Sequence, residues 1–194
     1  MDKFRIDPQD SAFLLIDFQS NLAAAMKQAV YNNCEQNVNL IISACNILNV
    51  PIIVTEQYSK GLGSTVESIK HNLGVHYKPI DKLSFSCYAD AGFQASFSRL
   101  NKKYALVSGI ESHVCVLQSA LDLIANGYIV HIISDAVCSR YKNDWEKAMD
   151  YMNNAGAIIT TTEIVVFQLL RKAGTAEFKA ISPLFKNRES SWPI

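Results

Sequence analysis

The sequence lacks an excess of charge of either sign. Its 194 residues include 18 lysines and arginines and 18 aspartates and glutamates, so the formal net charge at pH 7 is zero. It also contains no block of basic residues, which chains that bind nucleic acid or membrane surfaces often carry. We therefore expect neither a nucleic-acid partner nor a membrane partner.

Long apolar runs and a leader pattern are also missing. No apolar stretch approaches the roughly 20 residues of a transmembrane helix. The first ten residues are polar and include three aspartates, which does not fit a signal peptide or a mitochondrial presequence. The five cysteines are an odd number without the spacing of a disulfide framework, which favours free thiols in a reducing compartment. We expect a cytoplasmic protein that forms one domain over residues 1–194.

Motifs for metals and phosphates are absent as well. The four histidines, His71, His76, His113 and His131, have no ligand spacing to nearby aspartates or cysteines. Gly61-Leu62-Gly63 fits neither the dinucleotide-binding nor the Walker pattern, so a loop is the better interpretation. We expect no metal site and no cofactor.

Short apolar runs alternate with segments of helical periodicity along the whole chain. Strands are predicted at 12–16, 51–54, 77–80, 104–107, 128–133 and 156–159. Helices are predicted at 38–48, 93–100, 112–125, 144–154 and 164–172. Thr160-Thr161-Thr162-Glu163 has the form of a capping box before the last of these helices. This alternation predicts an α/β fold with a parallel sheet covered by helices on both faces.

Three reactive side chains follow predicted strands. Asp17 and Lys82 come just after the first and third strands, and Cys115 follows the fourth. Ligands of parallel sheets bind at the carboxyl ends of the strands. If Ser112 is the N-cap, Cys115 lies in the first turn of a helix, where the helix dipole favours a thiolate.

Each of these residues also has an ordinary structural interpretation. Cys115 could be a buried core cysteine, Asp17 a turn cap and Lys82 a surface lysine. Glu163 is explained as a helix cap. The remaining cysteines are interpreted as structural: Cys34, Cys45, Cys87 and Cys138. Together, however, a carboxylate, an amine and a thiol at strand ends can share one pocket and shift one another's pKa values.

At these positions the chain resembles the isochorismatase-like (cysteine hydrolase) superfamily. Three landmarks carry the resemblance: Leu14-Leu15-Ile16-Asp17-Phe18-Gln19, Lys82-x-x-Phe85-Ser86, and Ser108-Gly109-Ile110-Glu111-Ser112-His113-Val114-Cys115-Val116. Similarity continues through Ser134–Arg140, Gly156–Ile158 and Phe178–Leu184, and so spans roughly residues 13–184. The loop 55–63 resembles the subgroup called isochorismatase domain-containing proteins.

The resemblance implies a fold and a catalytic arrangement. The implied fold is a three-layer α/β/α structure with a six-stranded parallel sheet. The implied triad is Asp17, Lys82 and Cys115. A cis peptide bond is implied between Ile110 and Glu111, and the backbone N–H groups of Glu111 and Cys115 are implied to form an oxyanion hole.

Two departures from the superfamily narrow the implied chemistry. Nicotinamidases hold a divalent metal through an Asp-x-His motif after the second strand, whereas this chain has Glu56-Gln57-Tyr58 there. True isochorismatases lack the nucleophilic cysteine, whereas Cys115 is present here. The resemblance therefore points to metal-independent acyl transfer.

The resulting hypothesis is a cysteine hydrolase that cleaves a small amide or related C–N bond through a covalent thioester. Gln19, Gln57, Tyr58 and Phe85 are expected to line the substrate pocket. An alternative keeps the fold but makes it a low-turnover ligand-binding or regulatory module, and nucleic-acid processing is a third possibility. We expect a small-molecule substrate, which the sequence does not identify, and a homo-oligomer, either a dimer or a larger assembly.

Overall fold

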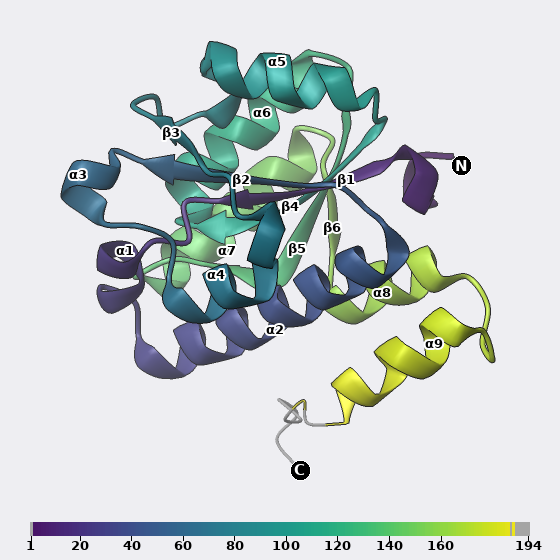
Figure 1. Ribbon diagram of the computed structural model, residues 1–194. Helices are drawn as coiled ribbons and strands as arrows, with labels where there is room; N and C mark the ends of the chain where they lie inside the picture. Colours follow the sequence, from purple (N-terminus) through teal and green to yellow (C-terminus); the bar gives the residue numbers. More distant parts are fainter. Residues whose placement is uncertain (1, 187, 189–194) are drawn as a thin grey trace.

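A computed structural model describes residues 2–186 and 188 (Figure 1). Its one sheet has the strands β1 (Ser11–Ile16), β2 (Ile52–Gln57), β3 (Ile80–Lys82), β4 (Tyr104–Ile110), β5 (Ile129–Cys138) and β6 (Ile158–Thr160). Every neighbouring pair is parallel, and the order is β3-β2-β1-β4-β5-β6. The predicted α/β fold with a six-stranded parallel sheet is confirmed.

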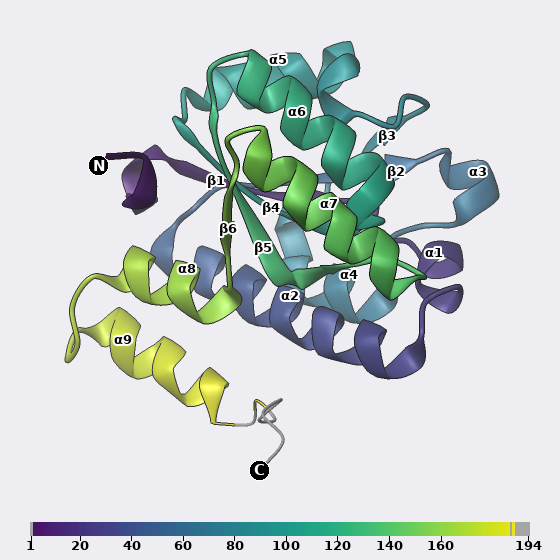
Figure 2. The ribbon, with the colours of Figure 1, turned by 180° about the vertical axis from the view of Figure 1, so that it is seen from behind.

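Helices cover both faces of this sheet. They are α1 (Ser20–Ala24), α2 (Gln28–Leu48), α3 (Ser59–Leu62), α4 (Glu67–Leu73), α5 (Ala91–Leu100), α6 (Leu117–Ala125), α7 (Lys142–Asn154), α8 (Thr162–Leu170) and α9 (Ala176–Ile181). Figures 1 and 2 show α5, α6 and α7 on one face and α2, α4 and α8 on the other, with α9 outside α8. Within the described residues, no helix combines the length and the apolar character needed to cross a bilayer.

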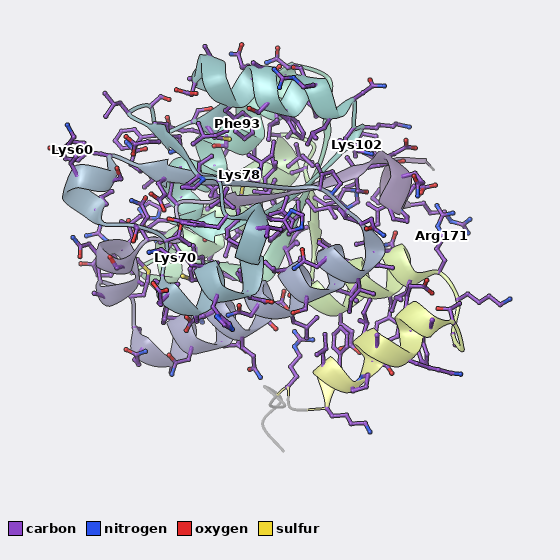
Figure 3. The ribbon with its side chains drawn as sticks, in the orientation of Figure 1. Lys60, Lys70, Lys78, Phe93, Lys102 and Arg171 are labelled. Atoms are coloured by element: carbon purple, nitrogen blue, oxygen red, sulfur yellow. The ribbon has the colours of Figure 1, made fainter. Side chains whose placement is uncertain are left out.

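The alternation of side chains along β1 divides the core into two layers. Phe13 and Leu15 pack on the side of α2, whereas Leu14 and Ile16 pack on the side of α5 to α7. Phe93 of α5 joins the second layer, and Figure 3 shows it between that helix and the sheet. Each such fully buried side chain contributes roughly 1.5–3 kcal/mol through removal of apolar surface from water.

The strand order reverses between β1 and β4. From β1 the chain adds β2 and β3 on one side, and it then crosses back to add β4, β5 and β6 on the other. The carboxyl ends of β1 and β4 therefore flank the switch point, which is where ligands of open α/β sheets bind.

The third strand was predicted too early. The structure pairs Ile80 and Lys82 with β2, so β3 runs over residues 80–82 rather than 77–80. Pro79 has no N–H group to donate to a ladder, which favours a strand that begins after it. Lys82 is consequently the last residue of the strand and not part of the following loop.

The predicted N-cap at Ser112 was wrong. Glu111 takes that position, with φ −93° and ψ 145°, and Ser112–Val116 form a π-helical turn ahead of α6. Cys115 is still within the first turn after β4. The hydroxyl of Ser112 is buried without a hydrogen-bond partner in the described part of the chain.

The start of α8 also differs from the prediction. Thr161 is the N-cap but makes no side-chain cap bond, so the predicted capping box does not form. Instead, Asp135 of β5 accepts hydrogen bonds from the N–H (2.8 Å) and Oγ1 (2.9 Å) of Thr162. A charged acceptor from another element thus replaces the local cap. The helix ends at Leu170 because Arg171 adopts φ 59°.

Candidate active site

Asp17 follows β1 directly and is completely buried. Its φ of 52° lies in the left-handed region, which aspartate tolerates better than most residues. Oδ1 accepts a hydrogen bond from Thr55 Oγ1 at 2.7 Å, and Oδ2 lies 2.6 Å from Lys82 Nζ. Both carboxylate oxygens therefore have a fixed partner.

Lys82 is buried as deeply as Asp17, with 1% of its surface exposed. In addition to Asp17, its ammonium donates to Gln57 Oε1 (2.8 Å) and to the backbone oxygens of Ser84 (3.2 Å) and Phe85 (3.1 Å). A buried charge is stable only where such partners replace water. The interpretation of Lys82 as a surface lysine is thereby excluded.

Gln19 and Gln57 were predicted to line the substrate pocket, but their amides bind the protein itself. Gln19 Nε2 donates to the backbone oxygens of Gln57 (3.0 Å) and Gly63 (2.6 Å), and its Oε1 accepts from the N–H of Gln57 (2.7 Å). Gln57 Nε2 donates to the backbone oxygen of Leu83 (2.7 Å). The two glutamines therefore brace the backbone around Lys82.

Cys115 lies in the turn Ser112–Val116 and is 5% exposed. Burial raises the pKa of its thiol well above the ordinary value, and the negative charge of Asp17 and its hydrogen bond raise that pKa further. The positive charge of Lys82 lowers it but does not compensate. Burial and the carboxylate therefore raise the pKa of this thiol, whereas its place after the strand was expected to lower it.

The segment between β4 and Cys115 is fixed from two sides. The peptide bond between Ile110 and Glu111 is cis. The buried carboxylate of Glu111 accepts two hydrogen bonds of 3.0 Å from Arg140, one from the backbone N–H and one from Nε. The backbone oxygen of Glu111 accepts from the N–H groups of Val114 (3.1 Å) and Val116 (3.3 Å).

Close contact between β1 and β4 fixes Asp17, which follows β1, relative to Cys115, which follows β4. Gly109 pairs with Ile16, the residue before Asp17, and has φ 151°. A Cβ atom at Gly109 would lie 2.2 Å from the backbone oxygen of Ile16. Only glycine permits this approach.

Tyr58 and Phe85, the other predicted pocket residues, lie at the surface beside Lys82. These two residues are 52% and 53% exposed, and Leu83, which directly follows Lys82, is 74% exposed. The N–H of Tyr58 donates to the backbone oxygen of Lys82 at 2.9 Å. We call Tyr58, Leu83 and Phe85 the apolar rim; its contact with a substrate stays a prediction.

The sequence interpretation missed two supports of the site. Thr55 donates a hydrogen bond to Asp17. In the sequence, only its place just after the second predicted strand indicated that it could belong to the site. The pairing of Glu111 with Arg140 had no local signal, because 29 positions separate the two residues.

Glu56 stands where nicotinamidases carry their metal motif, and its carboxylate accepts hydrogen bonds from within the protein. Glu56 Oε1 accepts from Thr65 N (2.7 Å), Thr65 Oγ1 (2.8 Å) and the hydroxyl of Tyr77 (2.7 Å). Among residues 2–186 and 188, no group of three or more histidine, cysteine, aspartate or glutamate side chains is arranged to hold a metal ion.

The sheet is parallel and doubly wound, and an acid, an amine and a thiol lie near its switch point. The chain is therefore an α/β protein whose candidate active site lies at the carboxyl ends of the strands. Within that class, residues 11–164 match the isochorismatase domain. Isochorismatase family protein 1B of Dictyostelium discoideum is 42% identical, with 95% of this chain and 90% of that protein covered. Isochorismatase domain-containing protein 2 of Danio rerio is 36% identical, with 93% and 89% covered. The chain belongs to the isochorismatase family.

Solved structures show the same fold. The structure of MAR1 ribonuclease from Caenorhabditis elegans has a TM-score of 0.88 and is 35% identical, with 98% of each chain covered. The YcaC gene product of Escherichia coli, an octameric hydrolase of unknown specificity, has a TM-score of 0.87 and is 25% identical, with 95% of this chain and 90% of that chain covered.

Proposed function

We propose that the protein is a metal-independent cysteine hydrolase that cleaves a small amide or related C–N bond. The observation that carries the proposal is the buried Asp17–Lys82 ion pair of 2.6 Å, whose carboxylate also acts on the thiol of Cys115. A buried ion pair is expensive to maintain. Its place at the switch point, against a cysteine, supports a catalytic role. The YcaC hydrolase similarity gives independent support.

In the first half of the proposed reaction, Asp17 takes the proton of the Cys115 thiol as the sulfur attacks the substrate carbonyl carbon. The N–H groups of Glu111 and Cys115 stabilise the oxyanion that forms. Asp17 then gives its proton to the leaving nitrogen, the C–N bond breaks, and a thioester on Cys115 remains. Because burial raises the pKa of the thiol, the sulfur depends on Asp17 to remove its proton.

In the second half, Asp17 takes a proton from water as the water oxygen attacks the thioester carbon. The tetrahedral intermediate collapses, the carboxylic acid leaves, and the sulfur recovers its proton from Asp17. Lys82 neither gives nor takes a proton in these steps. Its contacts with Asp17 and Gln57 orient the carboxylate and keep its charge compensated whenever Asp17 is ionised.

A panel of small primary amides tests the proposal through release of ammonia. Wild type is expected to release ammonia from at least one amide, whereas Cys115→Ala, Asp17→Asn and Lys82→Met are expected to lose at least about 100-fold of that rate. Lys78→Met is the matched control, since Lys78 is exposed and outside the site. Equal rates for wild type and Cys115→Ala across the panel would refute the proposal and leave the binding-module alternative.

One observation favours a second candidate function. The similar structure from Caenorhabditis elegans is described as a ribonuclease. Incubation of wild type and Cys115→Ala with an end-labelled RNA at several salt concentrations separates the two candidates. Cleavage that Cys115→Ala retains would indicate a nuclease site other than the triad, and absence of cleavage would dismiss this candidate.

We also propose that the protein forms a homo-oligomer. The octameric YcaC product supports this, and the apolar rim beside Lys82 is a surface that a second copy could cover. Sedimentation equilibrium would then give a multiple of the 21.6 kDa chain mass. A mass of one chain at micromolar concentration would rule the oligomer out.

Residues 1–194 are proposed to act as one hydrolase domain in the cytoplasm. All five cysteines are free thiols, which supports a reducing compartment.

A further inference from the structure

A cavity of about 610 Å³, open to solvent, lies between the beginnings of α2 and α7 and the end of β5. Figures 1 and 2 show both helices beginning at the same end of the molecule. Asp17, Lys82 and Cys115 are not among the residues that line it. We call it the α2–α7 cavity.

Arg140 contributes free hydrogen-bond donors to the α2–α7 cavity. Its backbone N–H and its Nε are used by Glu111, both at 3.0 Å. Its two terminal nitrogens have no hydrogen-bond or ion-pair partner within the described part of the chain, and its side chain is 49% exposed. Two adjacent guanidinium N–H groups match the two oxygens of a carboxylate.

The other charges around the cavity also favour an anion. Lys27 has no ion pair among the described residues, and Lys142 pairs only with Glu146 at 3.3 Å, an exposed contact. Asp135 is the acidic residue of the lining. Its carboxylate is already occupied, since Oδ1 binds Thr162 and Oδ2 binds Arg188.

The remaining wall of the cavity is apolar. Trp145 presents a large aromatic surface, and Val30 and Val137 add aliphatic surface. Val30 is 46% exposed, although it lies in the first turn of a long helix. Its side chain is therefore available to contact a ligand in the cavity. A ligand with a planar apolar body matches this wall.

We propose that the α2–α7 cavity binds a small carboxylate with a planar apolar body, of which benzoate is the simplest example. Its carboxylate pairs with the terminal nitrogens of Arg140 and with Lys27, and its ring packs on Trp145 and Val30. Two contacts connect this site to the turn that carries Cys115. Arg140 holds Glu111, and Ser139 Oγ lies 3.0 Å from Nδ1 of His113.

Binding is measured directly by the fluorescence of Trp145. The chain has two tryptophans, so Trp192→Phe leaves Trp145 as the only reporter. Titration of this variant with benzoate is expected to give a saturable fluorescence change. Benzyl alcohol, which has the same ring without the charge, is expected to give none. Because the readout is binding, the result does not depend on whether Cys115 performs hydrolysis.

Two further substitutions locate the ligand, each made in the Trp192→Phe protein. Lys27→Ala and Val30→Asp are expected to weaken benzoate binding at least about tenfold, the first by removing a charge-assisted contact and the second by adding repulsion. Both positions are exposed, and aspartate is favourable in the first turn of a helix, so the fold is retained.

The matched controls Lys78→Ala and Val75→Asp make the same changes at exposed positions shortly before β3, an edge strand that does not line the α2–α7 cavity. They should bind benzoate as tightly as the Trp192→Phe protein does. Figure 3 labels Lys78. The proposal is overturned by no saturable response to benzoate, by an equal response to benzyl alcohol, or by equal affinity of the cavity variants and the controls.

Discussion

At the scale of single residues, Asp17 and Lys82 act on the same thiol in opposite directions. The carboxylate favours the protonated form of Cys115, and the ammonium favours the thiolate. Burial adds to the effect of the carboxylate, so the pKa of Cys115 is raised. The carboxylate that raises the pKa of the thiol is also the group placed to remove its proton when a substrate arrives.

Alkylation of Cys115 by iodoacetamide should therefore respond oppositely to the two charges. Asp17→Asn removes a negative charge and leaves the ammonium of Lys82, which lowers the pKa of the thiol and raises its alkylation rate at pH 7 by about tenfold or more. Lys82→Met removes the stabilising positive charge and lowers the rate. Peptide mapping by mass spectrometry measures both rates.

Lys78→Met serves as the control for a lost surface charge, with an alkylation rate unchanged from wild type. A slower reaction in Asp17→Asn than in wild type would show that the carboxylate does not raise the pKa of the thiol. In wild type the rate should keep rising with pH beyond the range where an ordinary cysteine is fully ionised, because the pKa of Cys115 is raised.

At the scale of elements, the approach of β1 to β4 depends on one glycine. Gly109→Ala introduces a Cβ that would lie 2.2 Å from the backbone oxygen of Ile16 at a φ of 151°. We expect a loss of about 2–4 kcal/mol in the free energy of unfolding, measured by urea denaturation. Loss of activity should accompany it, because Asp17 follows Ile16.

Gly127→Ala is the matched control for this experiment. Gly127 also has positive φ, 85°, but a Cβ there would meet no atom within 4 Å. Only the backbone cost of about 1 kcal/mol is expected. Equal losses for the two variants would mean that the close approach of β1 and β4 is not what requires glycine at position 109.

A buried histidine on β5 should make the fold sensitive to acid. Burial lowers the pKa of His131 to about 4, although its Nε2 lies 3.0 Å from the backbone oxygen of Lys3. In the unfolded chain the pKa of histidine is about 6.5. As the pH falls from about 6.5 to 4, this histidine takes up its proton in the unfolded chain before it does so in the folded protein. Its contribution to the free energy of unfolding is therefore complete above about pH 6.5 and is lost on acidification toward pH 4.

The His131→Gln variant isolates this contribution. Between pH 7.5 and 4.5 its unfolding free energy should fall less than that of wild type, by on the order of 3 kcal/mol. Urea denaturation at the two pH values measures the difference. An identical fall in both proteins would show that His131 takes up its proton in the folded state as readily as in the unfolded chain.

The elements differ in how well the sequence predicts them. Strand β1 and the end of α2 at Asn49 are visible from local pattern, because a continuous apolar run and a left-handed asparagine both act locally. The capping of α8 by Asp135 is not visible, because it depends on a contact across 27 positions. The pairing of β4 with β5 shifts register between Val107 and Gly109, where Ser108 donates to the backbone oxygen of Ala136, and this irregularity also has no local sequence signal.

At the scale of the whole molecule, the doubly wound topology brings together residues that are far apart in the sequence. Asp17 and Lys82 are 65 positions apart in the sequence. They meet because β1, β2 and β3 are consecutive parallel strands, so the carboxyl ends of β1 and β3 lie on the same side of the sheet. The sequence predicts this meeting from the strand ends. It does not predict that the pKa of the thiol is raised or that Gln19 and Gln57 are braces, because burial and hydrogen-bond partners depend on the packed molecule.

The central claim is that Cys115 accepts an acyl group with the help of Asp17. The most direct test is a rapid-quench reaction with the amide p-nitroacetanilide, whose leaving nitrogen needs the proton that Asp17 supplies, followed by mass spectrometric mapping of all five cysteines. The account predicts an acetyl group on Cys115 in wild type and a markedly slower reaction in Asp17→Asn. The other four cysteines should stay unmodified, as they are buried free thiols. Acetylation spread over several cysteines, or none on Cys115, would contradict the account.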